Sequence, residues 1–545
     1  MSIVSGFKNT VLSFIFYFCL KINDQQMPIL GPLVKRVYEL GRLPEIAKPK
    51  LDPYTAQKRV LKKLLRRAQF TAFGEYYGFS DMVKSHDIIS AFQSKVPTFT
   101  YNTMFRKWWY RILNGESFVT WPGRVKYFAL TSGTSEASSK HIPVTMEMIR
   151  AIRKVSIRQL VSSLSYHLPD NFYEKGMLKI GGSTHLHFNG PYYEGDLSGI
   201  SASTIPFWFQ HFYKPGKRIS RERDWATKLD EIVKSAINWD IGVIVGVPAW
   251  IQIILERIIS HYNLKTIHDI WPSLAIYVHS GVSFEPYAKS FEKLFGKPMI
   301  FHESYLASEG YIAYQKRIHE RAMTLVLDNG LFFEFVPFDS NNFDEDGNMV
   351  EKPVALTIDQ VEENKEYALL LSTCAGSWRY LIGDTIKFTS KAHSEIIITG
   401  RTKHFLSICG EHLSVDNMNR AIKMLCDDLN IEIREFTVTG VKYNSLWAHK
   451  WYLGTDDPLD GELAKEKIDE YLKILNDDYR VERIAAIKDV FVEVLPSRAF
   501  STWMKIHKKE GGANKFPRVL KKDLQSEWEN YLVEYNFKNN HADHP

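Results

Sequence analysis

Residues 131–140 read Thr-Ser-Gly-Thr-Ser-Glu-Ala-Ser-Ser-Lys, a run of hydroxyl side chains around one glycine that ends in a lysine. The run follows the apolar residues 127–130, which are typical of a β-strand. Backbone N–H groups and hydroxyls donate hydrogen bonds to phosphate oxygens, and a lysine adds positive charge. The segment therefore predicts either a phosphate-binding loop after a strand or a Ser/Thr-rich turn with a surface lysine, two readings that it supports equally.

The sequence around this loop alternates between strand-like and helix-like patterns, which indicates an α/β fold with β-sheets flanked by helices. The predicted strands are 177–180, 241–247, 273–278, 323–327, 331–336 and 367–372, and the predicted helices are 54–69, 225–237 and 250–261. Segment 337–351 is rich in Asp, Asn and Gly, so we expect a loop there.

The length of 545 residues predicts at least two folded units, because a single domain rarely exceeds roughly 300 residues. We place a boundary near residue 400, giving a large domain over 1–400 and a small α+β domain over 401–545; the family resemblance described below implies a hinge at about 400–404. The small domain is predicted to contain helices at 413–427, 461–475 and 521–534 and strands at 435–441 and 490–495.

Composition excludes several classes of protein. Hydrophobic residues make up 45% of the chain, which excludes a disordered protein, and the net charge of 69 − 63 = +6 is too weak to indicate nucleic-acid binding. Four cysteines without a CxxC pair indicate a reduced, cytoplasmic protein. The apolar run 11–20 is too short to span a bilayer, so we expect a buried or amphipathic helix in preference to peripheral membrane contact. The motifs GxxxxGK[ST], HExxH and GxSxG are absent.

Four further segments carry residues suited to nucleotide chemistry, although each also has a plain structural interpretation. Tyr305 in 305–310 offers a ring to a nucleobase and Glu309 a carboxylate to Mg²⁺, or they end a strand with a core tyrosine. Asp384 follows a glycine and suits ribose hydroxyls, or it belongs to an ordinary turn. Segment 400–405 lies at the predicted domain boundary, or it is a linker with surface charges. Lys515 is flanked by glycines and is predicted to lie on a loop.

Taken together and in this order, the five segments resemble the acyl-adenylating superfamily that includes luciferases and acyl-CoA synthetases. The chain resembles more closely the auxin-responsive-promoter family of acyl-acid amido synthetases, especially its bacterial members. Supporting stretches are 71–79, 246–250, 271–274, 279–287 and 333–335, so the resemblance covers nearly the whole chain.

The resemblance implies a large N-terminal adenylate-forming domain and a small, mobile C-terminal domain. It implies that ATP, with Mg²⁺, and a small carboxylic acid form an acyl-adenylate, which an amine, usually of an amino acid, then attacks to give an amide and AMP. From the weak charge and the lack of a membrane-length apolar run, we expect neither a nucleic-acid partner nor stable membrane insertion.

The resemblance also assigns roles to individual residues. The phosphate loop is matched by Ser132, Gly133, Thr134, Ser135 and Lys140. Tyr305 matches the adenine-stacking position, with Ser308 beside the nucleotide, and Glu309 matches the Mg²⁺-associated carboxylate. Asp384 and Arg401 match ribose-binding positions, Lys403 falls at the hinge, and Lys515 matches the lysine that contacts the reacting carboxylate and the α-phosphate.

The chain departs from the pattern in the phosphate loop, where Ala137 replaces a usual glycine and Ser138 an often basic residue. Coenzyme A ligases share the first half-reaction, so an acid–CoA ligase is the main alternative, and a catalytically silent binding protein on the same fold is another. The sequence does not name the acyl acid. The aromatic region 185–208 is a candidate for its pocket, although we expect most of its aromatic side chains to belong to a core.

Overall fold

The computed structural model describes residues 51–131, 140–162, 166, 168–205, 209–281, 284–317, 320–344, 347–402, 405–406, 413–443, 446–476, 479–480, 483, 487–507, 516–520 and 522–542. Several predictions lie outside these ranges. They concern the apolar run 11–20, the phosphate-loop residues Ser132, Gly133, Thr134 and Ser135, the hinge residue Lys403 and the catalytic candidate Lys515.

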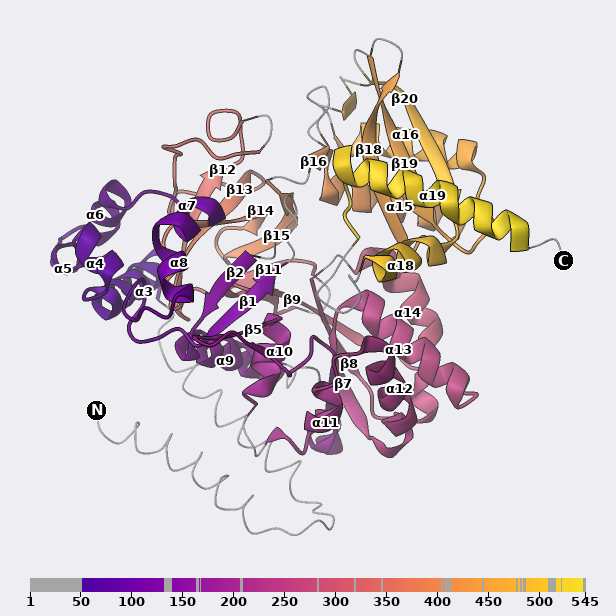
Figure 1. The fold of residues 1–545 in the computed structure, drawn as a ribbon, viewed down its shortest axis with the longest axis horizontal. Helices are drawn as coiled ribbons and strands as arrows, with labels where there is room; N and C mark the ends of the chain where they lie inside the picture. The colour runs from indigo at the N-terminus through magenta and orange to yellow at the C-terminus, as the bar shows by residue number, and fades with distance from the viewer. Residues whose placement is uncertain are drawn as a thin grey trace, which may run out of the picture.

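A mixed sheet of eleven strands forms the centre of the described chain (Figure 1). Its order is β12-β13-β14-β15-β11-β10-β9-β8-β7-β3-β6. The parallel part contains β3 (Gly176–Lys179), β6 (Tyr213–Lys214), β7 (Ile241–Gly246), β8 (Ile276–Ser280) and β9 (Ile300–Ala307). The antiparallel part contains β10 (Gly310–Gln315), β11 (Met323–Leu325), β12 (Leu331–Pro337), β13 (Glu366–Thr373), β14 (Tyr380–Ser390) and β15 (Glu395–Arg401).

Helices connect the parallel strands, as parallel pairing requires, because a tight turn cannot bring the chain back in the same direction. They are α10 (Leu197–Ser203), α11 (Gly216–Ser220), α12 (Trp225–Ser235), α13 (Pro248–His261) and α14 (Ala288–Leu294). Figure 1 shows α12, α13 and α14 gathered beside β7 and β8. Their apolar faces pack on these strands in one core cluster, which includes Ile244, Ile254 and Tyr277.

The N-terminal helices form a layer on the antiparallel end of the large sheet (Figure 1). They are α3 (Pro53–Ala68), α4 (Ala72–Tyr77), α5 (Phe79–Met82), α6 (Ile88–Lys95), α7 (Tyr101–Met104), α8 (Tyr110–Leu113) and α9 (Met146–Ser162). The buried amide of Gln57 on α3 donates to the backbone oxygens of Leu327 and Leu331 at 2.8 and 3.0 Å. This contact fixes α3 to β12, while the basic residues of the helix largely face solvent, as expected for a solvated helix face.

A second sheet of four strands, ordered β2-β1-β5-β4, supports the loop singled out in the sequence. It consists of β1 (Tyr127–Thr131), β2 (Lys140–Val144), β4 (His187–Phe188) and β5 (Tyr193–Gly195). Strands β1 and β2 are antiparallel, and Thr131 lies opposite Lys140 in the register. The residues on either side of segment 132–139, Thr131 and Lys140, are therefore paired with each other in this sheet.

The C-terminal part contains a three-stranded sheet of β18 (Glu435–Tyr443), β19 (Leu446–Gly454) and β20 (Ile487–Leu495). Around it lie the short pair β16 (Phe405–Leu406) and β17 (Leu413–Ser414) and the helices α15 (Val415–Leu429), α16 (Gly461–Leu475), α18 (Ser497–Ile506) and α19 (Lys522–Ala542). Its two core clusters contain only residues from Leu406 onward, whereas the main cluster of the large sheet ends at Ile396. A domain boundary between these cores stays a prediction.

The α/β class predicted from the sequence is confirmed, and most predicted elements occur within a few residues of their expected bounds. The predicted strand 273–278 begins only at Ile276, because Pro272 and Ser273 form a turn. The predicted helix 225–237 ends at Ser235 and continues as a 3₁₀ turn, and helix 521–534 extends to Ala542. Among the described residues, no helix is long and apolar enough to cross a membrane.

Candidate active site

The hairpin formed by β9 and β10 carries three of the predicted site residues. Tyr305 lies in β9, and Ser308 and Glu309 form the turn between the paired residues Ala307 and Gly310. Gly310 has φ +147°, and a Cβ atom there would approach Leu331 Cδ2 to 3.0 Å. The turn therefore needs glycine at this position, and it sets Glu309 at the tip of the hairpin.

A neighbouring pair of strands carries Asp384 and Arg401, which face each other in the register of β14 and β15. Gly383, with φ +88°, bends the chain immediately before Asp384. Arg401 Nε lies 3.0 Å from Asp384 Oδ1, and Tyr305 Oη donates to Asp384 Oδ2 at 2.5 Å. The structure thus brings Tyr305, Asp384 and Arg401 together, although Tyr305 and Arg401 lie 96 positions apart in the sequence.

Glu309 is a buried carboxyl group with an unusual pKa. Burial is the main cause that raises the pKa of Glu309 to about 7; the negative charge of Asp384 acts in the same direction, and the cations of Arg401 and Lys140 act in the opposite direction. In the part of the chain that the structure describes, no other residue donates a hydrogen bond to this carboxylate. Its oxygens are therefore available to a cation or to another donor brought by a ligand.

Lys140, at the start of β2, joins this group. Its ammonium nitrogen lies 5.6 Å from the centre of the Tyr101 ring, whose hydroxyl accepts a hydrogen bond from the backbone N–H of His141 at 3.0 Å. The charge of Lys140 also lowers the pKa of Glu309. Lys140 and the hairpin tip consequently belong to one electrostatic cluster.

Tyr380, a residue without an assigned role in the sequence, borders the same cluster. It is buried, and burial together with the charge of Glu309 raises its pKa well above the usual range, so it stays neutral. Tyr305 is buried too, and its pKa is raised by burial and by Asp384. Two buried, neutral phenols therefore lie beside the carboxylates, a feature that the sequence could have suggested only through the position of Tyr380 in segment 378–384.

A buried ion pair holds the start of β14 in place, and sequence reasoning missed it. Arg379, the residue before this strand, pairs with Glu334 of β12 at 2.8 Å, and both side chains are almost fully buried. Arg379 Nη1 also donates to the backbone oxygens of Gln93 and Val96 at 2.9 and 2.7 Å. These contacts tie the N-terminal helices to β14, five residues before Asp384.

The other predicted site residues are less fully placed. Ser308 is half-buried in the hairpin turn, and the described contacts give it no partner. Lys515 lies outside the described residues, but Arg518, three positions later, donates from Nη1 to Glu435 Oε2 at 2.5 Å. Tyr287, next to α14, donates to the other oxygen of Glu435 at 3.3 Å. This interaction connects the residues that follow Lys515 to the large sheet's helices.

The candidate acyl pocket at 185–208 contains both core and surface residues. Tyr192 and Ile200 are buried, whereas Phe188 is 57% exposed. The carboxylate oxygens of Glu194 lie 3.0 Å from Nε2 of His141 and 3.0 Å from Nδ1 of His187. The buried aromatic residue agrees with the core interpretation, and the location of the acyl pocket stays a prediction.

A divalent cation at this site would bind to a single protein carboxylate, that of Glu309. Among the described residues there is no group of three or more His, Cys, Asp or Glu side chains that could hold a metal ion. Mg²⁺ commonly binds through one or two carboxylates together with substrate phosphates and water. The available oxygens of Glu309 fit that mode of binding.

Comparison with sequence profiles identifies three domains of one family along the chain. The GH3 family N-terminal domain matches residues 42–220, the GH3 family central domain matches residues 324–397, and the GH3 family C-terminal domain matches residues 416–523. Together they extend over most of the chain and include Lys140 and Asp384.

Similar curated proteins are plant amido synthetases. Jasmonoyl–L-amino acid synthetase JAR6 of Nicotiana attenuata is 30% identical over 193 residues, which are 33% of this chain and 32% of that protein. Indole-3-acetic acid-amido synthetase GH3.10 of Arabidopsis thaliana is 27% identical over 199 residues, 34% of this chain and 33% of that protein. The matched segment thus spans about a third of each relative.

Solved structures extend the fold likeness to nearly the whole chain. The GH3.15 acyl acid amido synthetase superposes with a TM-score of 0.71 at 16% identity, covering 94% of this chain and 97% of that one. A 2-hydroxyisobutyryl-CoA ligase in the postadenylation state gives a TM-score of 0.57 at 10% identity, covering 88% and 92%. At these identities the likeness establishes the fold.

Proposed function

Because the chain belongs to the GH3 family, as its three matched domains show, we propose that it is an acyl-acid amido synthetase. It uses ATP to convert a carboxylic acid into an acyl-adenylate and transfers the acyl group to an amine of an amino acid. The observation that supports this proposal best is the cluster of Glu309, Asp384, Arg401, Tyr305 and Lys140, in which cations and acceptors suited to a nucleotide meet.

In the first step a carboxylate oxygen attacks the α-phosphorus of ATP, an oxygen–phosphorus bond forms, and pyrophosphate leaves. Two anions must approach each other, so nearby positive charge is required. Lys140 supplies such a charge at the base of the phosphate loop, where Ser132, Gly133, Thr134 and Ser135 are proposed to donate hydrogen bonds to phosphate oxygens. Asp384 and Arg401 are proposed to bind the ribose, and Tyr305 the adenine.

Glu309 is proposed to hold Mg²⁺, with Ser308 beside the nucleotide, and a bound Mg²⁺ neutralises charge that develops on the phosphates. Glu309 itself must lose its proton to do so. Its raised pKa means that ionisation occurs near neutral pH, where the cations of Arg401 and Lys140 assist it. Binding of Mg²⁺ and ATP should consequently release a proton from this residue.

In the second step the amine nitrogen attacks the acyl carbon, a carbon–nitrogen bond forms, and AMP leaves with the bonding electrons. The nitrogen loses a proton in the process. Lys515 is proposed to contact the reacting carboxylate and the α-phosphate during the first step. A small C-terminal domain, turning at a hinge near Lys403, is proposed to bring Lys515 to the site and later to withdraw it.

The proposal is tested by measuring ATP–pyrophosphate exchange with the full chain, Mg²⁺ and a panel of aromatic, indolic and fatty acids. At least one acid should raise exchange well above the acid-free rate. Amino acids, hydroxylamine and coenzyme A are then added separately with the active acid. An amide formed with an amino acid supports the proposal, whereas a thioester without an amide identifies an acid–CoA ligase. Binding of ATP without exchange on any acid would indicate a silent binding protein.

A further inference from the structure

The N-terminal helical layer holds an unusual share of the protein's positive charge. Residues 51–126, which contain α3 to α8, include 13 Lys and Arg and 5 Asp and Glu residues, a net charge of 13 − 5 = +8. The whole chain carries only +6. Figure 1 shows the indigo helices α3 to α6 at one outer end of the molecule, on the opposite side from α19. A charge asymmetry of this kind indicates a surface that binds a polyanionic partner, such as a membrane or a nucleic acid.

Helix α3 presents much of this charge as one stripe, which consists of Arg59, Lys62, Lys63, Arg66 and Arg67. The residues follow the spacing i, i+3, i+4, i+7 and i+8, which places all of them on one face of the helix. All five side chains belong to exposed residues, and the helix contains no acidic residue. The apolar residues between them are buried, so the stripe faces outward.

Little negative charge of the protein compensates the α3 stripe. Arg67 pairs with Glu147 of α9 at 2.9 Å, and in the described part of the chain no acidic side chain pairs with the other four cations. Cations three or four positions apart on a helix repel each other and destabilise it. The favourable interaction of basic residues with the carboxyl end of a helix accounts only for the two residues in the last turn and leaves the three before them unexplained.

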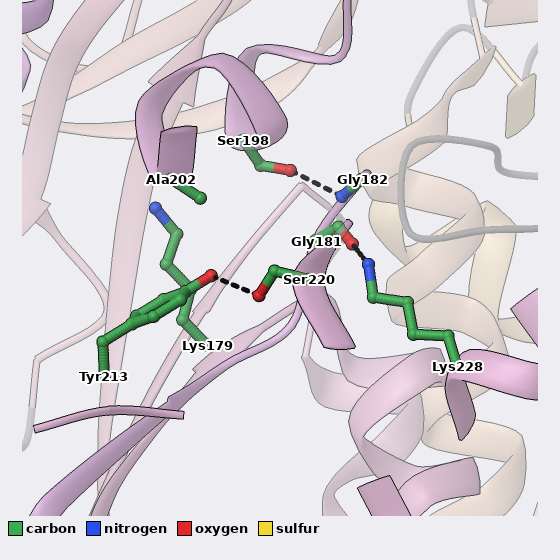
Figure 2. Close-up of a pocket in the computed structure, with 8 residues that line it drawn as sticks. All are labelled: Lys179, Gly181, Gly182, Ser198, Ala202, Tyr213, Ser220 and Lys228. Carbon is green, nitrogen blue, oxygen red and sulfur yellow. Dashed lines mark hydrogen bonds between the residues drawn. The ribbon is translucent and has the colours of Figure 1, made fainter. Parts of the chain in front are cut away.

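Some basic side chains in other parts of the chain have partners within the protein, which makes the contrast clear. Lys228 of α12 donates to the backbone oxygen of Gly181 at 3.0 Å, as Figure 2 shows. Arg158 of α9 donates to both carboxylate oxygens of Asp328, at 2.6 and 2.7 Å. The α3 stripe instead leaves most of its charge to the solvent or to a partner outside the chain.

Two exposed phenylalanines lie at the end of the α3 stripe. Phe70 comes eleven positions after Arg59, so it continues the same helical spacing, and it is 70% exposed. Phe118 is 51% exposed, and its backbone oxygen accepts a hydrogen bond from the N–H of Ala72 at 2.8 Å, which places it beside the residues that follow α3. Its φ of +59° is unusual for a bulky residue. Exposed rings beside cations suit the interface of a bilayer, where rings enter the apolar boundary and cations meet lipid phosphates.

We propose that the α3 stripe, together with Phe70 and Phe118, binds reversibly to the surface of a bilayer that contains anionic lipids. The lipid phosphates compensate the cations that have no acidic partner in the described chain, and the two rings enter the interface beside them. Binding to the phosphates of a nucleic acid would use the cations but not the exposed rings, so the rings favour a lipid surface. The surface is separate from the proposed nucleotide site, and this proposal does not depend on the proposed function.

The first test measures sedimentation of the full chain, without ATP or an acyl acid, with vesicles of phosphatidylcholine alone or with about 30% phosphatidylglycerol. At about 100 mM salt the protein should bind the anionic vesicles at least about tenfold more tightly, and about 500 mM salt should reduce this difference by screening the exposed charges. Equal binding to both kinds of vesicle, or binding to neither, overturns the proposal. Binding to a DNA duplex of mixed sequence without binding to vesicles identifies a nucleic-acid surface and also overturns it.

A triple variant with Lys62→Gln, Lys63→Gln and Arg66→Gln assigns the binding to α3. A basic residue near an anionic bilayer contributes roughly fivefold in affinity, so the three changes together should weaken binding about 100-fold. All three residues are exposed and have no described ion pair, so the variant should keep the thermal midpoint of the wild-type protein. Wild-type affinity in the folded triple variant overturns the proposal.

A matched control removes the same charge elsewhere. Lys217→Gln, Lys234→Gln and Arg420→Gln change exposed residues of α11, α12 and α15 and should together leave the affinity within about twofold of wild type. A loss equal to that of the α3 variant would show that only net charge matters, and it would overturn the proposal. Phe70→Gln should weaken binding to anionic vesicles about fivefold at both salt concentrations, since the ring acts through its apolar surface. An unchanged affinity refutes the role proposed for this ring.

Discussion

Replacing Glu309 by glutamine should make the protein more stable at alkaline pH while removing the proposed Mg²⁺ ligand. The carboxyl group is 8% exposed, and its pKa rises from 4.5 to about 7 in the folded protein. The unfolded chain therefore loses this proton at a lower pH than the folded protein does. Glu309→Gln removes the charge and with it the cost of burying a carboxylate.

The sign and size of the effect follow from linkage. A carboxyl with a raised pKa favours the folded state below pH 4.5, and this contribution is lost as the pH rises to about 7. A difference of roughly 2.5 pKa units corresponds to about 3 kcal/mol, since one unit is about 1.4 kcal/mol. At pH 8 the variant should gain up to about 3 kcal/mol over the wild-type protein, and at pH 4.5 almost nothing.

Urea denaturation at pH 4.5, 6 and 8, in buffer without Mg²⁺ or ATP, measures the free energy of unfolding of each variant. Glu351→Gln is the matched control, because Glu351 is exposed in a loop of the same sheet region. It should change the free energy of unfolding by less than about 0.5 kcal/mol at every pH. A Glu309→Gln protein that is less stable at pH 8 than at pH 4.5, relative to wild type, would refute the burial argument.

Three further changes test the site and its support. Asp384→Ala should weaken ATP binding about 10- to 100-fold in calorimetry, because ribose hydrogen bonds are lost, and an unchanged affinity counts against that role. Lys515→Ala should suppress pyrophosphate exchange and leave ATP affinity mostly intact, so normal exchange would remove Lys515 from the mechanism. Glu334→Gln should cost about 3–5 kcal/mol in urea denaturation, because it leaves the buried Arg379 charge unpaired, and a loss below 1 kcal/mol would contradict this.

Several residues of the candidate site can be named from the sequence where short motifs carry chemistry. Segment 305–310 indicated Glu309 and Tyr305, and segment 378–384 indicated Asp384. The hydrogen bond from Tyr305 to Asp384 was not predictable, because it joins two hairpins whose distance depends on the pairing of β9, β10, β11, β15 and β14. The pair of Arg379 and Glu334 was missed for the same reason, since local patterns do not show which strands become neighbours.

The sequence by itself determined the elements whose signals are local. The apolar periodicity of α3 and α16 and the β-rich runs of β7 and β12 depend on residues within one turn or one strand. Only the tertiary structure decided the raised pKa of Glu309, the neutral state of Tyr380 and the burial of the ion pair of Arg379 and Glu334. These properties arise from removal of water and from charges contributed by distant segments, and neither is encoded in the spacing of nearby residues.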